Sequence, residues 1–281
     1  MPQIKKILFP VDFSGSCRGA ARYVEAIAGQ FEAEIMLFHA VVRGEHTMAE
    51  ELLPGRKQQL DKFLAEELKV FTTHLVCETT EDPPTAIADA ARSWNADLVM
   101  MPTHGLGYFR RQLIGSATAK TLHDLTCPVW TSVHAESAPV LEEIHCRKIL
   151  CSLDSTENGR KVLEWAAWLA GQYQASLGIV HATGAADAPG SAGWYLGEEL
   201  TRRVSAQARE WIDALQVEAG TSVQTLIRPG SPPKVVASAA EEFGADLLVM
   251  GRHGSGEGIA GHLFQNAYSI LCESPCPVIS I

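Results

Sequence analysis

The chain contains the same sequence blocks twice, and this duplication constrains its fold more than any other feature. KKILFPVDFS at Lys5–Ser14 matches RKILCSLDST at Arg147–Thr156. Three further matches follow in the same order: EIMLFHA with SLGIVHA, ADLVMMPTHG with ADLLVMGRHG, and CPVWTSV with CPVISI. A period of roughly 145 residues is far too long for a solenoid repeat, whose units have about 20–50 residues. The sequence therefore predicts two copies of one domain.

The two copies are expected at residues 1–136 and 145–281, since 281 residues suit two domains of average size. A polar segment with one proline, His134–Cys146, is typical of a linker between them. The first matched blocks are 142 residues apart and the later ones 149 residues apart, which indicates a seven-residue insertion in the second copy.

Short apolar segments alternate with amphipathic ones along each copy. The first copy has strand candidates at Lys6–Val11, Glu34–Val42, Thr73–Glu78, Asp97–Met101 and Pro128–Val133, and helix candidates at Gly15–Gln30, Met48–Phe71, Pro84–Trp94 and Ser116–Leu125. Strands that are apolar throughout are typical of a parallel sheet covered on both faces. The predicted fold class is α/β: two tandem doubly wound (Rossmann-like) domains, each a five-stranded parallel sheet with helices on both faces.

Composition and charge exclude several classes of protein. A net charge of −10 argues against nucleic-acid binding, which needs clustered Lys and Arg. No run of about 18 apolar residues occurs, so we expect no membrane partner. The seven cysteines form no CxxC pair and indicate a reducing compartment, so we expect a cytoplasmic protein.

Doubly wound sheets bind ligands at the carboxyl ends of their strands. In the first copy these positions are residues 10–12, 39–40 and 101–105, and the last helix opens at residues 115–118. A helix that starts at Gly115-Ser116 offers unbonded backbone N–H groups and a positive dipole end to an anion. Asp12 can accept a hydrogen bond from an exocyclic amine or a sugar hydroxyl. Taken singly, each feature is equally well explained as an ordinary helix cap.

Together these residues resemble the universal stress protein family, and the resemblance covers both copies almost end to end. It rests on FPVDFS, LFHA, CPVW, CPVI, and MPTHG followed by nine residues and Gly-Ser. ATP-binding members carry Gly, two residues, Gly, nine residues and Gly-Ser or Gly-Thr. The resemblance implies ATP, with Mg²⁺ left open as a companion. From the adenine to the phosphates, its contacts are expected at Pro10, Val11, Asp12, Ala40, Met101, Pro102, His104, Gly105, Gly115, Ser116, Ala117 and Thr118.

Each copy departs from that motif at one place. Pro102 replaces the first glycine and has no N–H, and the loss of one hydrogen bond of about 0.5–1.5 kcal/mol weakens a nucleotide by roughly tenfold. The second copy keeps Gly251 and Gly254 but has Phe264-Gln265 in place of Gly-Ser. We therefore expect the second copy to be degenerate, and to act as a structural partner or hold another ligand.

Three functions are compatible with these features. The first is a stress-response regulatory module that binds adenine nucleotide in the first copy and contacts a still unidentified protein. The second is a non-nucleotide scaffold, and the third is a weak ATPase. GxSxG, a Walker A lysine and HExxH are absent from the sequence. An efficient enzyme is therefore not expected, and slow ATP hydrolysis or autophosphorylation is the most that the resemblance allows.

The last strand of each copy is an apolar edge strand that needs a cover. We expect Val129–Val133 to pair antiparallel with Val278–Ile281 in an intramolecular pseudo-dimer. Further homodimerisation is left open by the sequence.

Overall fold

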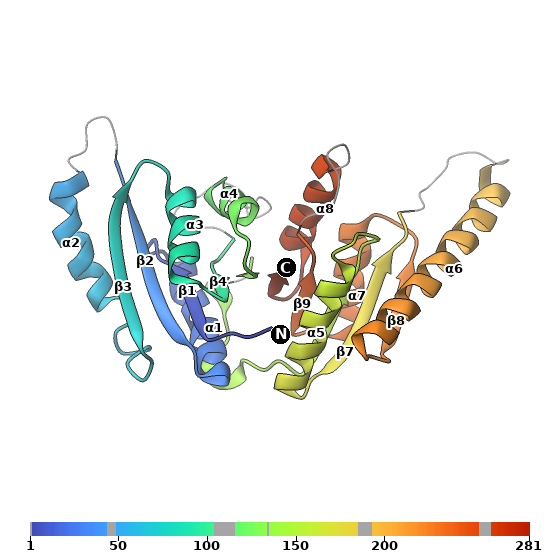
Figure 1. Cartoon of the computed structure of the whole chain (residues 1–281), viewed down its shortest axis with the longest axis horizontal. Helices are drawn as coiled ribbons and strands as arrows, with labels where there is room; N and C mark the ends of the chain where they lie inside the picture. The colour runs from blue at the N-terminus through green and yellow to red at the C-terminus, as the bar shows by residue number, and fades with distance from the viewer. Residues whose placement is uncertain (1, 44–48, 104–115, 134, 185–192, 253–259) are drawn as a thin grey trace. The chain divides into compact units, whose positions relative to one another are not determined.

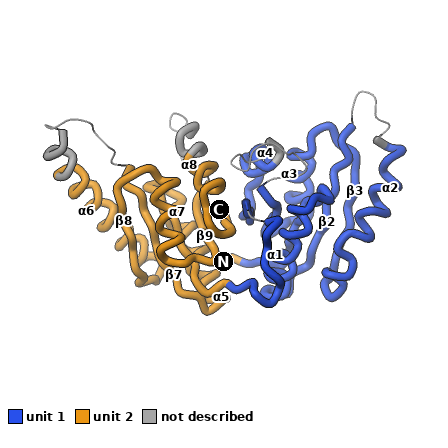
Figure 2. Tube along the Cα trace, turned by 180° about the vertical axis from the view of Figure 1, so that it is seen from behind, with its two compact units in different colours: residues 1, 3–145 blue, residues 2, 146–281 orange. Residues whose placement is uncertain are grey.

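The computed structural model describes residues 2–43, 49–103, 116–133, 135–184, 193–252 and 260–281. Within this range the chain divides into two compact units, Gln3–His145 and Cys146–Ile281, hereafter unit 1 and unit 2 (Figure 2).

Unit 1 is built on a five-stranded parallel sheet with the strand order β3-β2-β1-β4-β5 (Figure 1). Its strands are β1 (Lys6–Pro10), β2 (Glu34–Val42), β3 (Thr73–Thr80), β4 (Leu98–Met100) and β5 (Val129–Thr131). Its helices are α1 (Gly15–Phe31), α2 (Ala49–Lys62), α3 (Pro83–Trp94) and α4 (Ser116–Asp124), followed by the 3₁₀ turns η1 (Ala135–Ser137) and η2 (Leu141–Glu143). The strand order reverses at β1, which lies between β2 and β4.

Unit 2 repeats this arrangement with the strand order β10-β9-β6-β7-β8, again with parallel pairing. Its strands are β6 (Lys148–Ser152), β7 (Ser176–Ala182), β8 (Gln224–Arg228), β9 (Leu247–Met250) and β10 (Val278–Ser280). Its helices are α5 (Gly159–Tyr173), α6 (Gly193–Ala219), α7 (Pro232–Phe243) and α8 (Ala260–Glu273). The predicted α/β class with two tandem Rossmann-like domains is confirmed.

The apolar segments form the buried centre of each sheet, as the sequence pattern predicted. Ile7, Leu8 and Phe9 of β1 are fully buried, and Ile149 and Cys151 occupy the corresponding strand of unit 2. Helices lie on both faces of each sheet (Figure 1), as expected when right-handed crossovers run to either side of a reversal in strand order. Burial from both sides explains why the centres of these strands are apolar at successive positions.

Helix α1 begins and ends where its sequence provides caps. The Ser14 side chain accepts a hydrogen bond from the Cys17 N–H at 3.2 Å, so Ser14 is the N-cap of the helix. The helix ends at Glu32, which adopts a left-handed conformation with φ of 51°.

The segment after β5 packs on α1 rather than running as a plain linker. The Ser16 hydroxyl donates to Glu136 at 2.9 Å, and the Arg22 guanidinium donates to the Ala138 carbonyl at 2.5 Å. Part of the stretch expected to join the two copies therefore belongs to the body of unit 1.

The second helix of unit 1 is shorter than predicted. The amphipathic pattern indicated a helix to Phe71, but α2 ends at Lys62 and residues 63–70 form turns, with Leu64 at a φ of 60°. Phe63 and Leu68 are buried beneath these turns, at 5% and 3% exposure. Tertiary burial of these side chains overrides the local helical preference.

All seven cysteines lie among the described residues, and none of them forms a disulfide. Across the described ranges, we find no helix with the length and apolar character needed to cross a membrane.

Candidate functional site

The end of β1 in unit 1 forms a tight turn that presents Asp12. The Val11 N–H donates to the Phe38 carbonyl at 2.8 Å, which continues the β1–β2 ladder for one residue. One carboxylate oxygen of Asp12 then accepts the Ser14 N–H at 2.9 Å. Asp12 therefore closes the turn that leads into α1, and its carboxylate lies at the carboxyl edge of the sheet.

A buried histidine supports this turn from β2. The Nδ1–H of His39 donates to the Val11 carbonyl at 2.6 Å, and burial lowers the pKa of His39. His181 makes the same bond to the Leu153 carbonyl in unit 2, at 2.7 Å. Both histidines are buried and hydrogen-bonded.

An aromatic cluster that the sequence did not reveal lies beside the turn. Phe13 has a φ of 63°, and its ring lies 4.5 Å from His39 and 5.3 Å from Phe63. The guanidinium of Arg56 lies 5.9 Å from the Phe13 ring, and that of Arg18 lies 4.8 Å from the Phe63 ring. Arg56 belongs to α2 and Phe63 to the turns after it, and neither segment carries a recognisable motif.

The residues after β4 form the other side of the edge in unit 1. Met101, Pro102 and Thr103 are buried, and Thr103 bonds to the Ser132 carbonyl through both its N–H and its hydroxyl. The hydroxyl of Thr118, in the first turn of α4, lies 3.5 Å from the Pro102 carbonyl.

The structure thus brings part of the predicted site together. Because β1 lies between β2 and β4, residues 10–12, Ala40 and residues 101–102 share one edge of the sheet, and Thr118 joins them from α4. His104, Gly105 and Gly115 lie outside the described residues, as do the side chains of Ser116 and Ala117. The phosphate half of the predicted site therefore remains a prediction.

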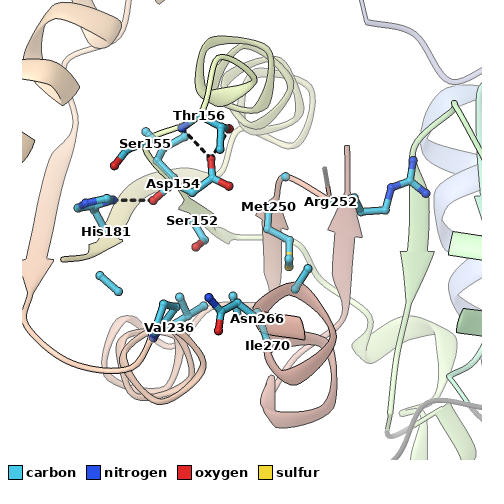
Figure 3. A pocket seen from close by; sticks show the side chains of 15 residues that line it. Ser152, Asp154, Ser155, Thr156, His181, Val236, Met250, Arg252, Asn266 and Ile270 are labelled. Atoms are coloured by element: carbon cyan, nitrogen blue, oxygen red, sulfur yellow. Dashed lines mark hydrogen bonds between the residues drawn. The ribbon is translucent and has the colours of Figure 1, made fainter. Parts of the chain in front are cut away.

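Unit 2 contains a cavity of about 300 Å³ at the equivalent edge of its own sheet (Figure 3). It opens between the ends of β6, β7 and β9 and the helices α7 and α8. Its lining includes Ser152, Asp154, Thr156, His181, Ala182, Val236, Met250, Arg252, Asn266 and Ile270. The prediction that this copy is degenerate rests on its glycine motif, and it stays a prediction.

Polar groups occupy one side of this cavity and apolar groups much of the other. Asp154 accepts hydrogen bonds from the N–H and the hydroxyl of Thr156, at 3.3 and 2.5 Å. Figure 3 shows Asp154 on one side of the space and Val236, Ile270 and the amide of Asn266 on the other. Asn266, Val236 and Ile270 carried no motif, so the sequence offered no signal for them.

Helix α8 differs from what the phosphate motif requires. Phe264 and Gln265, which replace the Gly-Ser of the motif, are the fifth and sixth residues of α8. In an α-helix, only the first four N–H groups lack an intrahelical partner. The backbone N–H groups of Phe264 and Gln265 are therefore engaged within the helix and do not form an anion cradle.

Comparison with known proteins identifies the family to which the sequence is similar. The model of the universal stress protein family matches residues 3–132 and 145–281. Universal stress protein MJ0531 of Methanocaldococcus jannaschii is 28% identical over 135 residues, which cover 44% of this chain and 79% of the relative. Universal stress protein Sll1654 of Synechocystis sp. is 30% identical over 132 residues, which cover 44% of this chain and 83% of the relative.

Solved structures show the same fold over the whole length. A universal stress protein from Archaeoglobus fulgidus DSM 4304 superimposes with a TM-score of 0.70 and 20% identity, covering 99% of this chain and 96% of that one. A putative universal stress protein from Pseudomonas aeruginosa UCBPP-PA14 gives a TM-score of 0.64 and 19% identity, covering 99% and 93%. Because the family model matches two successive segments that span nearly the whole chain, this chain belongs to the universal stress protein family and carries two such domains in tandem.

Proposed function

We propose that this protein is a stress-response regulatory module that binds an adenine nucleotide, ATP, in unit 1. The observation that carries the proposal is the convergence of Asp12, Ala40 and residues 101–102 on one edge of the sheet, with Thr118 of α4 beside them. In this arrangement a carboxylate faces the ligand at one end, and the start of a helix lies at the other.

The residues of unit 1 fit the chemistry of ATP in two respects. Val11 and Met101 provide buried apolar surface, at 4% and 6% exposure, that suits one face of an adenine ring. Asp12 can accept from the exocyclic amine or from a ribose hydroxyl while it holds the Ser14 N–H. Mg²⁺ would enter with the phosphates, since it binds through phosphate oxygens and water more readily than in all-protein cages.

Regulation would then follow from occupancy of the site. ATP bound at this edge contacts the turn into α1 and the first turn of α4, so its presence changes the surface that those elements offer to a protein partner. Regulation by ATP occupancy requires no catalytic residue.

A non-nucleotide scaffold is the second candidate, and two observations favour it. The cluster of Phe13, Phe63 and Arg56 lies next to the turn that presents Asp12. Pro102 lacks the N–H that a glycine would offer at the ribose. Aromatic and cationic side chains at the carboxyl edge of the unit 1 sheet suit recognition of a protein as well as binding of a nucleotide.

Thermal unfolding of the full chain with ATP, with AMP and without ligand distinguishes the two. A ligand at a hundredfold excess over its Kd stabilises the native state by about 2.7 kcal/mol. We expect ATP to raise the Tm of the wild type and of Ala182→Phe in unit 2. The matched variant Ala40→Phe in unit 1 should lose the effect. A Tm unchanged by millimolar ATP in the wild type would favour the scaffold.

A further inference from the structure

We propose that the β3 edge, the outer side of the backbone of Thr73–Thr80 in unit 1, is a docking surface for a second copy of this chain. The second copy adds its own β3 antiparallel to this edge. The surface is distinct from the ligand site proposed for unit 1, and dimerisation through it does not require a nucleotide.

The outward-facing backbone groups of β3 have no partner within the described part of the chain. The β2–β3 register is unbroken over all eight residues of β3. The Arg43 N–H donates to the Thr80 carbonyl, so the even-numbered residues of β3 bond to β2. Because successive residues of a strand bond to opposite sides, the odd-numbered residues direct their N–H and C=O groups outward. These residues, whose backbone groups are unbonded among the described residues, are Thr73, Leu75, Cys77 and Thr79.

Strand β3 also lacks the features that keep an edge strand from pairing. Natural edge strands are short, are interrupted by a bulge, or carry Lys or Pro. Strand β3 has eight residues in continuous register and contains neither Lys nor Pro. The side chains of His74, Leu75 and Glu78 are exposed. Since neighbouring side chains of a strand point to opposite faces, β3 is accessible from both faces.

The equivalent strand of unit 2, β8, is protected by its neighbouring helix. It has five residues, and α6 packs against it. On the side away from β7, the Val223 N–H donates to the Gln216 side chain of α6 at 2.6 Å, and Arg209 of α6 donates to the Thr225 carbonyl at 3.3 Å. Helix α2, the counterpart in unit 1, has 14 residues against 27 in α6, and its described side chains make no such bond to β3. Unit 2 therefore covers part of this edge with its own side chains, whereas unit 1 leaves it open.

The sequence of β3 is complementary to itself. In a two-fold symmetric pair the two strands run antiparallel. With Val76 opposite Val76 of the second copy, His74 lies opposite Glu78, which is a favourable cross-strand pair, and no two like charges meet. All outward-facing residues then pair among themselves, Thr73 with Thr79 and Leu75 with Cys77. An unrelated strand could use the same backbone groups, but it would not reproduce this match of side chains.

Analytical ultracentrifugation of the full chain over a range of concentrations tests the proposal. One pair of strands buries less than the roughly 1,600 Å² of a standard interface, so we expect a dimer that dissociates on dilution. Cys77→Pro removes one outward N–H and places a ring where the second strand would lie, but it leaves the bonds to β2 intact. It should weaken dimerisation at least about tenfold. Ile227→Pro, the matched change at an outward-facing position of β8, should leave dimerisation unchanged.

A cross-link tests the register and decides the matter even if a proline variant does not fold. Opposite residues of a non-hydrogen-bonded antiparallel pair have Cα atoms about 4.5 Å apart, which a disulfide can span. Val76→Cys should therefore give a dimer linked through residue 76 when diamide takes two electrons and two protons from the paired thiols. Thr80→Cys lies on the same face of β3, but roughly 25 Å from its counterpart in the second copy, and should not link to itself. Peptide mass spectrometry distinguishes these links from those of the seven native cysteines.

Four outcomes would overturn the proposal. The first is a wild-type chain that stays monomeric at about 100 µM. The second is folded Cys77→Pro protein that dimerises as tightly as the wild type, and the third is an equal loss in folded Ile227→Pro protein. The fourth is a Val76→Cys protein that yields no link at residue 76. Circular dichroism of each variant establishes whether it is folded.

Discussion

Gly19 of α1 lies directly against the backbone of Ala135: a Cβ atom placed on Gly19 would stand 1.7 Å from the Ala135 carbonyl oxygen. No methyl group fits at that distance. The close approach of α1 to η1 therefore depends on glycine at this position.

Gly19→Ala should accordingly destabilise the protein, although Ala is the better helix former by about 1 kcal/mol. We expect a loss of roughly 1–3 kcal/mol in the free energy of unfolding, as for other overpacked sites. Gly29→Ala in the same helix is the matched control, because the nearest atom to its added Cβ is 4.0 Å away. Urea denaturation should show the control equal to or more stable than the wild type. Equal stability of Gly19→Ala would mean that η1 does not pack on α1 as described.

The N-cap of α1 provides a second test. Ser14→Ala removes the acceptor of the Cys17 N–H and should lower the free energy of unfolding by about 1 kcal/mol. Ser231→Ala is the comparison, since Ser231 stands before α7 but makes no side-chain cap bond, with prolines in the first turn. Chemical denaturation should show a clear loss only for Ser14→Ala. A similar loss at both serines would argue against the hydrogen bond as the cause.

The histidine that supports the Asp12 turn predicts a pH dependence. Burial lowers the pKa of His39 below its ordinary value of 6.5, so the unfolded chain binds this proton more readily than the folded protein. The stability that neutral His39 contributes to the fold is fully present above pH 6.5. It is lost as the pH falls through the lowered pKa of His39. Unfolding free energies measured between neutral and mildly acidic pH should decline less steeply for His39→Gln than for the wild type. Parallel curves would show that His39 remains able to take up its proton in the fold.

Pro102 offers a test of the nucleotide site itself. If the backbone at this position faces the ribose, Pro102→Gly restores a donor worth about 0.5–1.5 kcal/mol and tightens ATP binding by up to roughly tenfold. Pro102→Ala restores the N–H but retains a Cβ, so it separates the donor from the steric effect. Titration calorimetry with ATP measures both. Unchanged affinity in the two variants would indicate that ATP does not contact this backbone.

The sequence predicted the fold well because the information lies in local apolar patterns. Strand β2 has the limits that its apolar segment predicted, and α3 differs by one residue at its start. The predicted end of α2 was wrong because tertiary contacts, which no local pattern records, bury Phe63 and Leu68.

The site was less predictable for a related reason. Asp12 and His39 stand at strand ends that the duplication marks, whereas the contact between Phe13 and Phe63 joins residues far apart in the sequence. The cavity of unit 2 depends on Asn266 and Val236, which belong to no motif. The pairing of the two edge strands and the phosphate contacts at Gly105 and Gly115 stay predictions.

The docking of the segment after β5 on α1 has a practical consequence for work on a single domain. A fragment cut at the last strand would remove the hydrogen-bond partners of Ser16 and Arg22, Glu136 and Ala138, and would take the Ala135 backbone away from Gly19. An isolated first domain should therefore be expressed through His145, so that the segment with η1 and η2 still packs on α1.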